Sequence, residues 1–366
     1  MKSVGIICEY NPFHNGHLYH IKKIKEMYPE YVIVCVMNGN FTQRGDFSLT
    51  DKYEKTMVAL NYVDLVIELP FVFGTQSADI FTKGSADILN KLGVDAFVFG
   101  SESNDINKLK NIVQIQNSLK YNKKIKDYLD QGFNYPTSLA NALKDFGVFL
   151  DNNPNDLLGI GYIRNLKVKE IKTIKRTNDY HSLKLEKISS ATGIRNALKE
   201  GKNIKEYVPD VSFKHLNETH FWDDYFDLLK YKIISSKDLS IYQTVDEGIE
   251  NKIKKNILNA HNIDELICLV KSKRYTYNKL KRMFLHILCS FTKEEAKKCA
   301  DIEYIRVLGF NENGKKYLNY VKKKCDLPII TKCDTSFEAM KIEKRADEIY
   351  NIKKDDYKEN FKPIIF

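Results

Sequence analysis

Near its N-terminus the chain reads Gly5-Ile6-Ile7-Cys8-Glu9-Tyr10-Asn11-Pro12-Phe13-His14-Asn15-Gly16-His17. The apolar run that ends at Cys8 predicts a buried strand, Asn11-Pro12 predicts a turn, and the apolar spacing after His17 predicts a helix. A loop that leads into a helix N-terminus presents backbone N–H groups to an anion. Two imidazoles three residues apart at such a turn point to one spot and can hydrogen-bond a phosphate that gains negative charge.

Further apolar segments alternate with segments of helical spacing. We expect strands at 31–37, 64–70, 96–100 and 169–176, and helices at 51–61, at 77–92, over most of 105–150 and after the turn at 152–156. This alternation predicts a parallel sheet with right-handed crossovers. Ligands bind at the carboxyl edge of such a sheet, where the polar loop Phe41-Thr42-Gln43-Arg44-Gly45-Asp46 follows the second strand. Residues 1–205 therefore read as a Rossmann-like α/β nucleotide-binding domain.

The pattern changes after Val208-Pro209. Residues 206–366 read as a mainly α-helical, basic second domain, with helices expected over 221–235 and 241–261. Residues 302–333 predict a short strand pair or loop packed back on the core. A length of 366 residues agrees with two domains.

Composition narrows the class of protein. The apolar and charged fractions are those of a soluble globular protein. An uninterrupted apolar run of about 18 residues and a cleavable signal pattern are both lacking. Seven scattered cysteines without a CxxC pair suit a reducing cytoplasm better than a disulfide framework or a zinc site. A net charge of +10 suggests a polyanionic partner, although Lys-rich proteomes show the same bias. We therefore expect a cytoplasmic protein that does not enter a membrane.

A second motif, Ile188-Ser189-Ser190-Ala191-Thr192-Gly193-Ile194-Arg195, is a hydroxyl-rich helix start with an arginine in its first turn. Such a segment offers backbone N–H groups, short hydroxyls and a cation to a polyphosphate. Taken alone, such a segment is usually only a helix cap. Arg176, at the end of the fifth predicted strand, faces the same sheet edge as the opening turn if that strand is parallel.

Together the two motifs resemble the HIGH-type nucleotidyltransferase superfamily, in which they bracket the triphosphate of ATP. The opening stretch, with Met37 to Gly45, is more closely similar to the bacterial tRNA(Met) cytidine acetate ligase family. Phe99 to Glu102, Pro154-Asn155, Lys175-Arg176 and Lys271 to Thr276 agree as well. The resemblance implies that ATP activates acetate as acetyl-adenylate and that the acetyl group passes to N4 of the wobble cytidine of elongator tRNA(Met).

The resemblance also implies site residues. His14 and His17 would act on the α-phosphate under attack, and Mg²⁺ is expected with the phosphates, its ligands unknown. Ser189, Ser190, Thr192 and Arg195 would hold the β- and γ-phosphates. The remaining ATP site would comprise Ile7, Cys8, Glu9, Tyr10, Asn11, Pro12, Phe13, His14, Asn15, Gly16, His17, His20, Gly100, Asn155 and Arg176.

Several residues keep two readings. His20 is read first as a capping or packing histidine and only second as an ATP-site residue. Glu9 orients a histidine or is merely solvated. Arg44 binds the acetate carboxylate or a phosphate, or it lies in an ordinary surface turn. The basic and aromatic segment that includes Lys273, Arg274, Tyr275, Lys279 and Arg282 would contact tRNA through its phosphates and unpaired bases. Its alternative reading is a solvated helix face with tyrosines in the core.

Two other functions use the same parts. A small-molecule cofactor adenylyltransferase would share the first domain but has no need of a large basic second one. A non-catalytic RNA-binding protein would have no need of His14, His17 and the Ser189 to Arg195 segment. The sequence does not decide whether the protein is a homodimer.

Overall fold

The computed structural model describes residues 1–133, 135–149, 153–176, 190–272, 274–354 and 362–366. In this part of the chain one sheet of eight strands forms the centre of the molecule, in the order β5-β4-β1-β2-β3-β6-β7 with β8 beside β6. Its strands are β1 (Ser3–Cys8), β2 (Val32–Asn38), β3 (Leu65–Leu69), β4 (Ala96–Ser101), β5 (Glu170–Lys175), β6 (Ile305–Phe310), β7 (Ile329–Ile330) and β8 (Ile364–Ile365). The first five are mutually parallel, which confirms the predicted α/β fold.

The helices that precede and connect these strands follow the predicted spacing in the first half of the chain. In order they are α1 (Asn15–Met27), α2 (Lys52–Leu60), α3 (Phe71–Gly74), α4 (Ala78–Leu92), α5 (Ile106–Gln116), α6 (Leu119–Asp130), α7 (Tyr135–Lys144), α8 (Pro154–Asn165) and α9 (Ala191–Lys199). The second half contributes α10 (Asp210–Lys214), α11 (Phe226–Ser235), α12 (Ile249–Asn256), α13 (Ile263–Val270), α14 (Tyr277–Leu288), α15 (Lys293–Lys298), α16 (Glu312–Val321) and α17 (Glu338–Tyr350).

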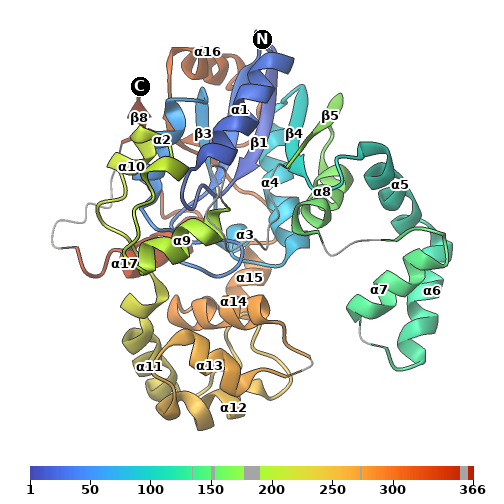
Figure 1. Cartoon of the computed structure of the whole chain (residues 1–366), viewed down its shortest axis with the longest axis vertical. Coiled ribbons are helices and arrows are strands. Elements are labelled where there is room, and N and C mark those ends of the chain that lie inside the picture. Colours follow the sequence, from blue (N-terminus) through green and yellow to red (C-terminus); the bar gives the residue numbers. More distant parts are fainter. Residues whose placement is uncertain (134, 150–152, 177–189, 273, 355–361) are drawn as a thin grey trace.

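Both faces of the sheet are covered, because alternate side chains of each strand point to opposite sides. On β2, Ile33 and Cys35 pack in the cluster that includes α1 and α2, whereas Val34 and Val36 pack in the cluster that includes α4, α8 and α17. The sheet therefore lies between two helical layers (Figure 1).

The end of the chain returns to this sheet. β6 pairs antiparallel with β3, and β7 and β8 pair with β6. We expected a short strand pair or loop packed on the core in residues 302–333. Instead, β6 and β7 extend the main sheet. A buried ion-pair group joins the two halves at this point: Lys52 contacts Glu68 at 2.5 Å and Glu343 at 3.2 Å, and Arg306 contacts Glu68 at 3.0 Å.

Helices of the second half form a separate layer below the carboxyl edge of the sheet, with α11 to α14 stacked together (Figure 1). The expected helix over 241–261 is wrong in its first part, since α12 begins only at Ile249. Thr244, Glu247 and Gly248 have positive φ angles, which a helix does not admit. The boundary between 1–205 and 206–366 stays a prediction. Within the described residues, no helix is long and apolar enough to cross a membrane.

Candidate active site

The loop between β1 and α1 fixes both motif histidines. His14 is the N-cap of α1, and its Nδ1 accepts a hydrogen bond from the Gly16 N–H at 3.0 Å. The His14 N–H in turn donates to Nδ1 of His17 at 3.3 Å, and the two rings stack with centroids 3.8 Å apart. Because both Nδ1 atoms accept, each neutral imidazole carries its proton on Nε2. The two rings therefore offer two Nε2–H donors side by side.

Burial decides the charge of these rings. Desolvation lowers the pKa of His14 to about 3, and Arg176 and Arg195 add to the effect. Desolvation also lowers the pKa of His17 well below its usual value, with His14 and Arg176 adding to it. His20, one turn further along α1, has its pKa lowered to about 4 by burial and by Arg176. At neutral pH these histidines are uncharged donors, which suits a role in holding a phosphate rather than in proton transfer.

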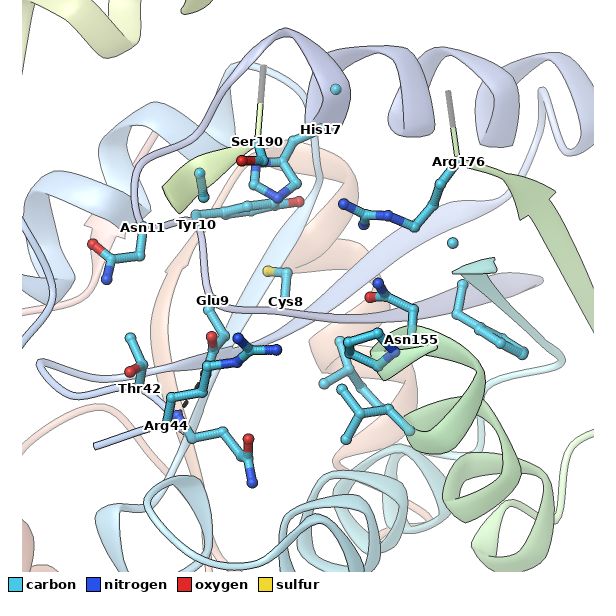
Figure 2. A pocket seen from close by; sticks show the side chains of 18 of the residues that line it. Cys8, Glu9, Tyr10, Asn11, His17, Thr42, Arg44, Asn155, Arg176 and Ser190 are labelled. Atoms are coloured by element: carbon cyan, nitrogen blue, oxygen red, sulfur yellow. Dashed lines mark hydrogen bonds between the residues drawn. The ribbon is translucent and has the colours of Figure 1, made fainter. Parts of the chain in front are cut away.

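The second motif closes over the first. Ser190 is the N-cap of α9, and its Oγ accepts from the Gly193 N–H at 3.1 Å. Arg195 donates from Nη1 to the main-chain oxygen of Asn11 at 2.8 Å and from Nη2 to Oγ1 of Thr192 at 3.2 Å. Figure 2 shows Ser190 beside His17 and Tyr10 on one side of the pocket. Ser189 lies outside the described residues.

A further wall comes from β4, β5 and the start of α8. Nδ2 of Asn155 donates to Glu102 at 2.6 Å, and the same carboxylate accepts the Asp156 N–H, so the first turn of α8 is held at the end of β4. A Cβ on Gly100 would lie 3.3 Å from Cγ of Arg176, so a larger residue would crowd that side chain. Figure 2 shows Arg176 and Asn155 across the pocket from Asn11 and Thr42.

These walls enclose one pocket of about 470 Å³. Most of the predicted ATP-site residues line it, namely Ile7, Cys8, Glu9, Tyr10, Asn11, His14, Gly16, His17, His20, Gly100, Asn155, Arg176, Ser190, Thr192 and Arg195. Phe13 is buried against Tyr62 instead, Asn15 donates to the Glu206 carbonyl, and Pro12 is not in the lining. The structure thus brings together two motifs that stand more than 170 residues apart.

Comparison with known proteins identifies the family. Residues 1–362 match the family model described as HIGH Nucleotidyl Transferase. The chain is 39% identical over 384 residues to the tRNA(Met) cytidine acetate ligase of Clostridium acetobutylicum, with 96% of each chain covered. The chain belongs to the tRNA(Met) cytidine acetate ligase family.

Solved structures of this family agree. The crystal structure of Thermotoga maritima TmcAL without ligand is 30% identical and has a TM-score of 0.92, with both chains fully covered. A second crystal structure of that protein, bound with alpha-thio ATP, is 29% identical with a TM-score of 0.89 and the same coverage. The predicted family resemblance is confirmed.

The residues predicted to contact tRNA lie in different environments. Arg274 is exposed and ion-paired with Glu247 at 3.3 Å. Tyr275 is only 5% exposed, its hydroxyl donates to the Asp246 carbonyl at 2.5 Å, and Nζ of Lys279 lies 4.6 Å from its ring centroid. A buried ring has little surface to stack on a base. Lys273 lies outside the described residues. The tRNA contact of this segment stays a prediction.

The sequence does not indicate that two further groups of residues line the pocket. Phe99 and Tyr162 line the pocket beside Gly100, and their apolar character gave no sign of a ligand. Thr276, Asn278 and Arg282 line it from the N-terminal part of α14, and Arg282 was expected on an RNA surface instead. Only long-range folding brings α14 to this edge, so no local signal in the sequence could have placed it there.

Proposed function

We propose that this chain activates acetate with ATP and acetylates N4 of the wobble cytidine of elongator tRNA(Met). The observation that carries the proposal is the closure of the two motifs around one pocket through the Arg195–Asn11 hydrogen bond, in a member of this family. A related protein of the family was crystallised with an ATP analogue, which supports the assignment of the pocket to ATP.

In the first step, a carboxylate oxygen of acetate attacks the α-phosphorus of ATP. A new P–O bond forms, the bond between the α-phosphorus and the bridging oxygen breaks, and pyrophosphate leaves. Negative charge grows on the α-phosphate oxygens, and the Nε2–H donors of His14 and His17 are suited to stabilise it. Ser190, Thr192 and Arg195 would hold the β- and γ-phosphates in line for this displacement.

In the second step, the N4 amine of cytidine attacks the acetyl carbon of acetyl-adenylate. A C–N bond forms, the bond from the acetyl carbon to the phosphate oxygen breaks, AMP leaves, and the amine loses one proton. The basic segment at the start of α14 borders the pocket, which supports an approach of tRNA from that side. Nucleic acid contact by this segment agrees with the net charge of +10.

Mg²⁺ belongs to the same proposal as a companion of ATP, whose phosphate charge it would neutralise. The described residues contain no group of three or more His, Cys, Asp or Glu side chains that could hold a metal ion. The pocket side chains beside the motifs are mostly neutral or cationic, so they fit an ion held by phosphates and water rather than by a protein cage. We also propose a cytoplasmic location, and a homodimer remains a prediction.

The test is acetate-dependent exchange of labelled pyrophosphate into ATP without tRNA. The proposal predicts exchange with acetate, and its loss in His17→Ala, while that variant keeps its tRNA affinity and its unfolding temperature. A cofactor adenylyltransferase would show no exchange with acetate, and a non-catalytic RNA-binding protein would show none with any carboxylic acid. Either result would refute the proposal.

A further inference from the structure

One wall of the pocket is built from two segments that stand far apart in the sequence. The loop after β2 contributes Gln43 and Arg44, and α14 contributes Arg282. The two segments touch along their backbones: Gly45 has φ +80°, and a Cβ built on it would lie 2.6 Å from the Arg282 nitrogen. Lys281 forms an ion pair with Asp46 at 2.5 Å, and Nε1 of Trp222 donates to the Gly45 carbonyl at 2.8 Å. This wall is therefore held rigidly.

Arg282 is a cation without a carboxylate partner in the described part of the chain. Its Nη1 makes one long hydrogen bond, 3.4 Å, to the main-chain oxygen of Gln43, and its Nε is buried with no hydrogen-bond partner. Burial lowers the pKa of Arg282 to about 10, and the charge of Arg44 adds to this effect. A partly buried guanidinium without a carboxylate partner costs stability, so its position in the pocket wall near a second arginine points to an anionic ligand.

The neighbouring side chains suit a small carboxylate with an apolar tail. Nε2 of Gln43 donates to the Gln76 carbonyl at 2.8 Å, which places the start of α4 against this loop. Ala78 and Phe81 of α4 belong to the pocket lining and are apolar. A guanidinium binds a carboxylate through two parallel hydrogen bonds. Arg282 is partly buried and lines the pocket, and its Nε is covered by protein, so a carboxylate would meet the two outer nitrogens of the guanidinium.

We propose that Arg282, in the pocket wall beside Arg44, binds the carboxylate of acetate and orients it for attack on the α-phosphate of ATP. The inference rests on the proposed function, because it names the site of the acid that ATP activates. It also moves Arg282 from the predicted tRNA surface to the chemistry of the first step. Figure 2 shows Arg44 extending into the pocket from the side opposite His17 and Arg176, with Cys8 and Glu9 between them. The acid would thus enter from one side and the phosphates from the other.

The test measures the KM for acetate in pyrophosphate exchange without tRNA, in Arg282→Gln, Arg282→Lys and the control Arg164→Gln. Arg164 is a suitable control because it is an exposed arginine, ion-paired with Asp79 at 3.4 Å, that does not line the pocket. Arg282→Gln should raise the KM for acetate by about 10- to 100-fold, the loss expected for a charge-assisted hydrogen-bonding partner. Arg282→Lys should recover part of it, and the KM for ATP should change less than about twofold in all three.

Stability separates this role from a structural one. Because Arg282 carries an unmet buried donor, Arg282→Gln should leave the unfolding temperature unchanged or raise it. An unchanged KM for acetate with weaker tRNA binding would show that Arg282 binds RNA phosphate and would overturn the proposal. An unchanged KM with a lower unfolding temperature would show a structural role and would also overturn it. Absence of exchange in the unmodified protein would instead refute the proposed function.

Discussion

Arg195 donates a hydrogen bond to the main-chain oxygen of Asn11 at 2.8 Å, and this contact joins the first turn of α9 to the loop between β1 and α1. Nη1 of Arg195 is the donor of this bond, and Nη2 donates a second hydrogen bond to Oγ1 of Thr192 at 3.2 Å. The guanidinium is thus fixed beside the histidines before any ligand arrives. Such preorganisation lowers the cost of stabilising charge during the reaction.

Substitution of Arg195 should therefore affect rate more than folding. Arg195→Met removes the cation and the link to Asn11, and we expect the rate of pyrophosphate exchange to fall by about 100- to 1,000-fold. Arg195→Lys keeps the charge but not the fork of donors, so it should restore only a small part of the rate. Steady-state exchange kinetics with a thermal unfolding control test this. A full rate in Arg195→Met would contradict the phosphate-binding role.

The pH dependence of exchange tests the charge state of the histidines. Burial lowers the pKa of His14 to about 3 and lowers that of His17, so both rings stay neutral as the pH falls from 8 to 6. The rate at saturating ATP and acetate should show no acid limb near the ordinary histidine pKa of about 6.5. His17→Asn should lower the rate at every pH by a similar factor. An acid limb near that value which disappears in His17→Asn would mean that His17 transfers protons instead.

The buried ion-pair group predicts that the two halves of the chain fold together. Lys52 of α2 faces Glu68 of β3 and the carboxylates of Glu343 and Asp347 on α17, and all four side chains are buried. Lys52→Met removes the cation that Glu68, Glu343 and Asp347 share, although Arg306 still pairs with Glu68. We expect this change to lower the free energy of unfolding by about 3–5 kcal/mol. Urea unfolding measures the change. A loss below about 1 kcal/mol would show that the group reorganises.

The same contacts predict that residues 1–205 do not fold alone. That fragment lacks β6, which covers the edge of β3, and α17, which supplies partners to Lys52. An uncovered strand edge disfavours the folded state, and so does a Lys52 that keeps Glu68 but has lost its partners Glu343 and Asp347. Circular dichroism and urea unfolding of the fragment test this, with the full chain as the control. A cooperative transition in the fragment would support an independent first domain.

The salt dependence of tRNA binding tests the predicted RNA surface. Arg274→Gln together with Lys279→Gln should weaken binding and reduce the slope of log affinity against log salt by about 0.7 for each RNA phosphate that is no longer neutralised. A filter-binding series over several salt concentrations measures the slope. The same pair should leave acetate-dependent exchange without tRNA unchanged. An unaltered slope would place the tRNA-binding surface elsewhere.

Local signals predicted the first half of this structure well. Each apolar run from Val4 to Arg176 became a parallel strand, and His14 became a helix cap because its position directly precedes the helical spacing. Ser190 and Thr192 line the pocket because the start of α9 lies at this edge of the sheet, and their contact with the phosphates stays a prediction. In these cases the neighbouring residues alone determine the geometry.

Long-range contacts were not predictable in this way. Ile305 to Phe310 has an apolar pattern that suits any strand, and only its pairing with β3 shows that it extends the main sheet. The lysines around Arg282 predict a surface cation. The backbone contact between Gly45 and α14 instead places Arg282 in the pocket wall. The cations of that segment look alike in sequence, and their different roles depend on which side of α14 meets the loop after β2.

Mass spectrometry of nucleosides shows whether this chain acetylates the wobble cytidine. Elongator tRNA(Met) would be incubated with the protein, ATP and isotopically labelled acetate, then digested and compared with a reaction containing His17→Ala. We expect labelled N4-acetylcytidine from the wobble position with the unmodified protein and none with the variant. Absence of labelled acetylcytidine from the complete reaction, with ATP and acetate in excess, would contradict it.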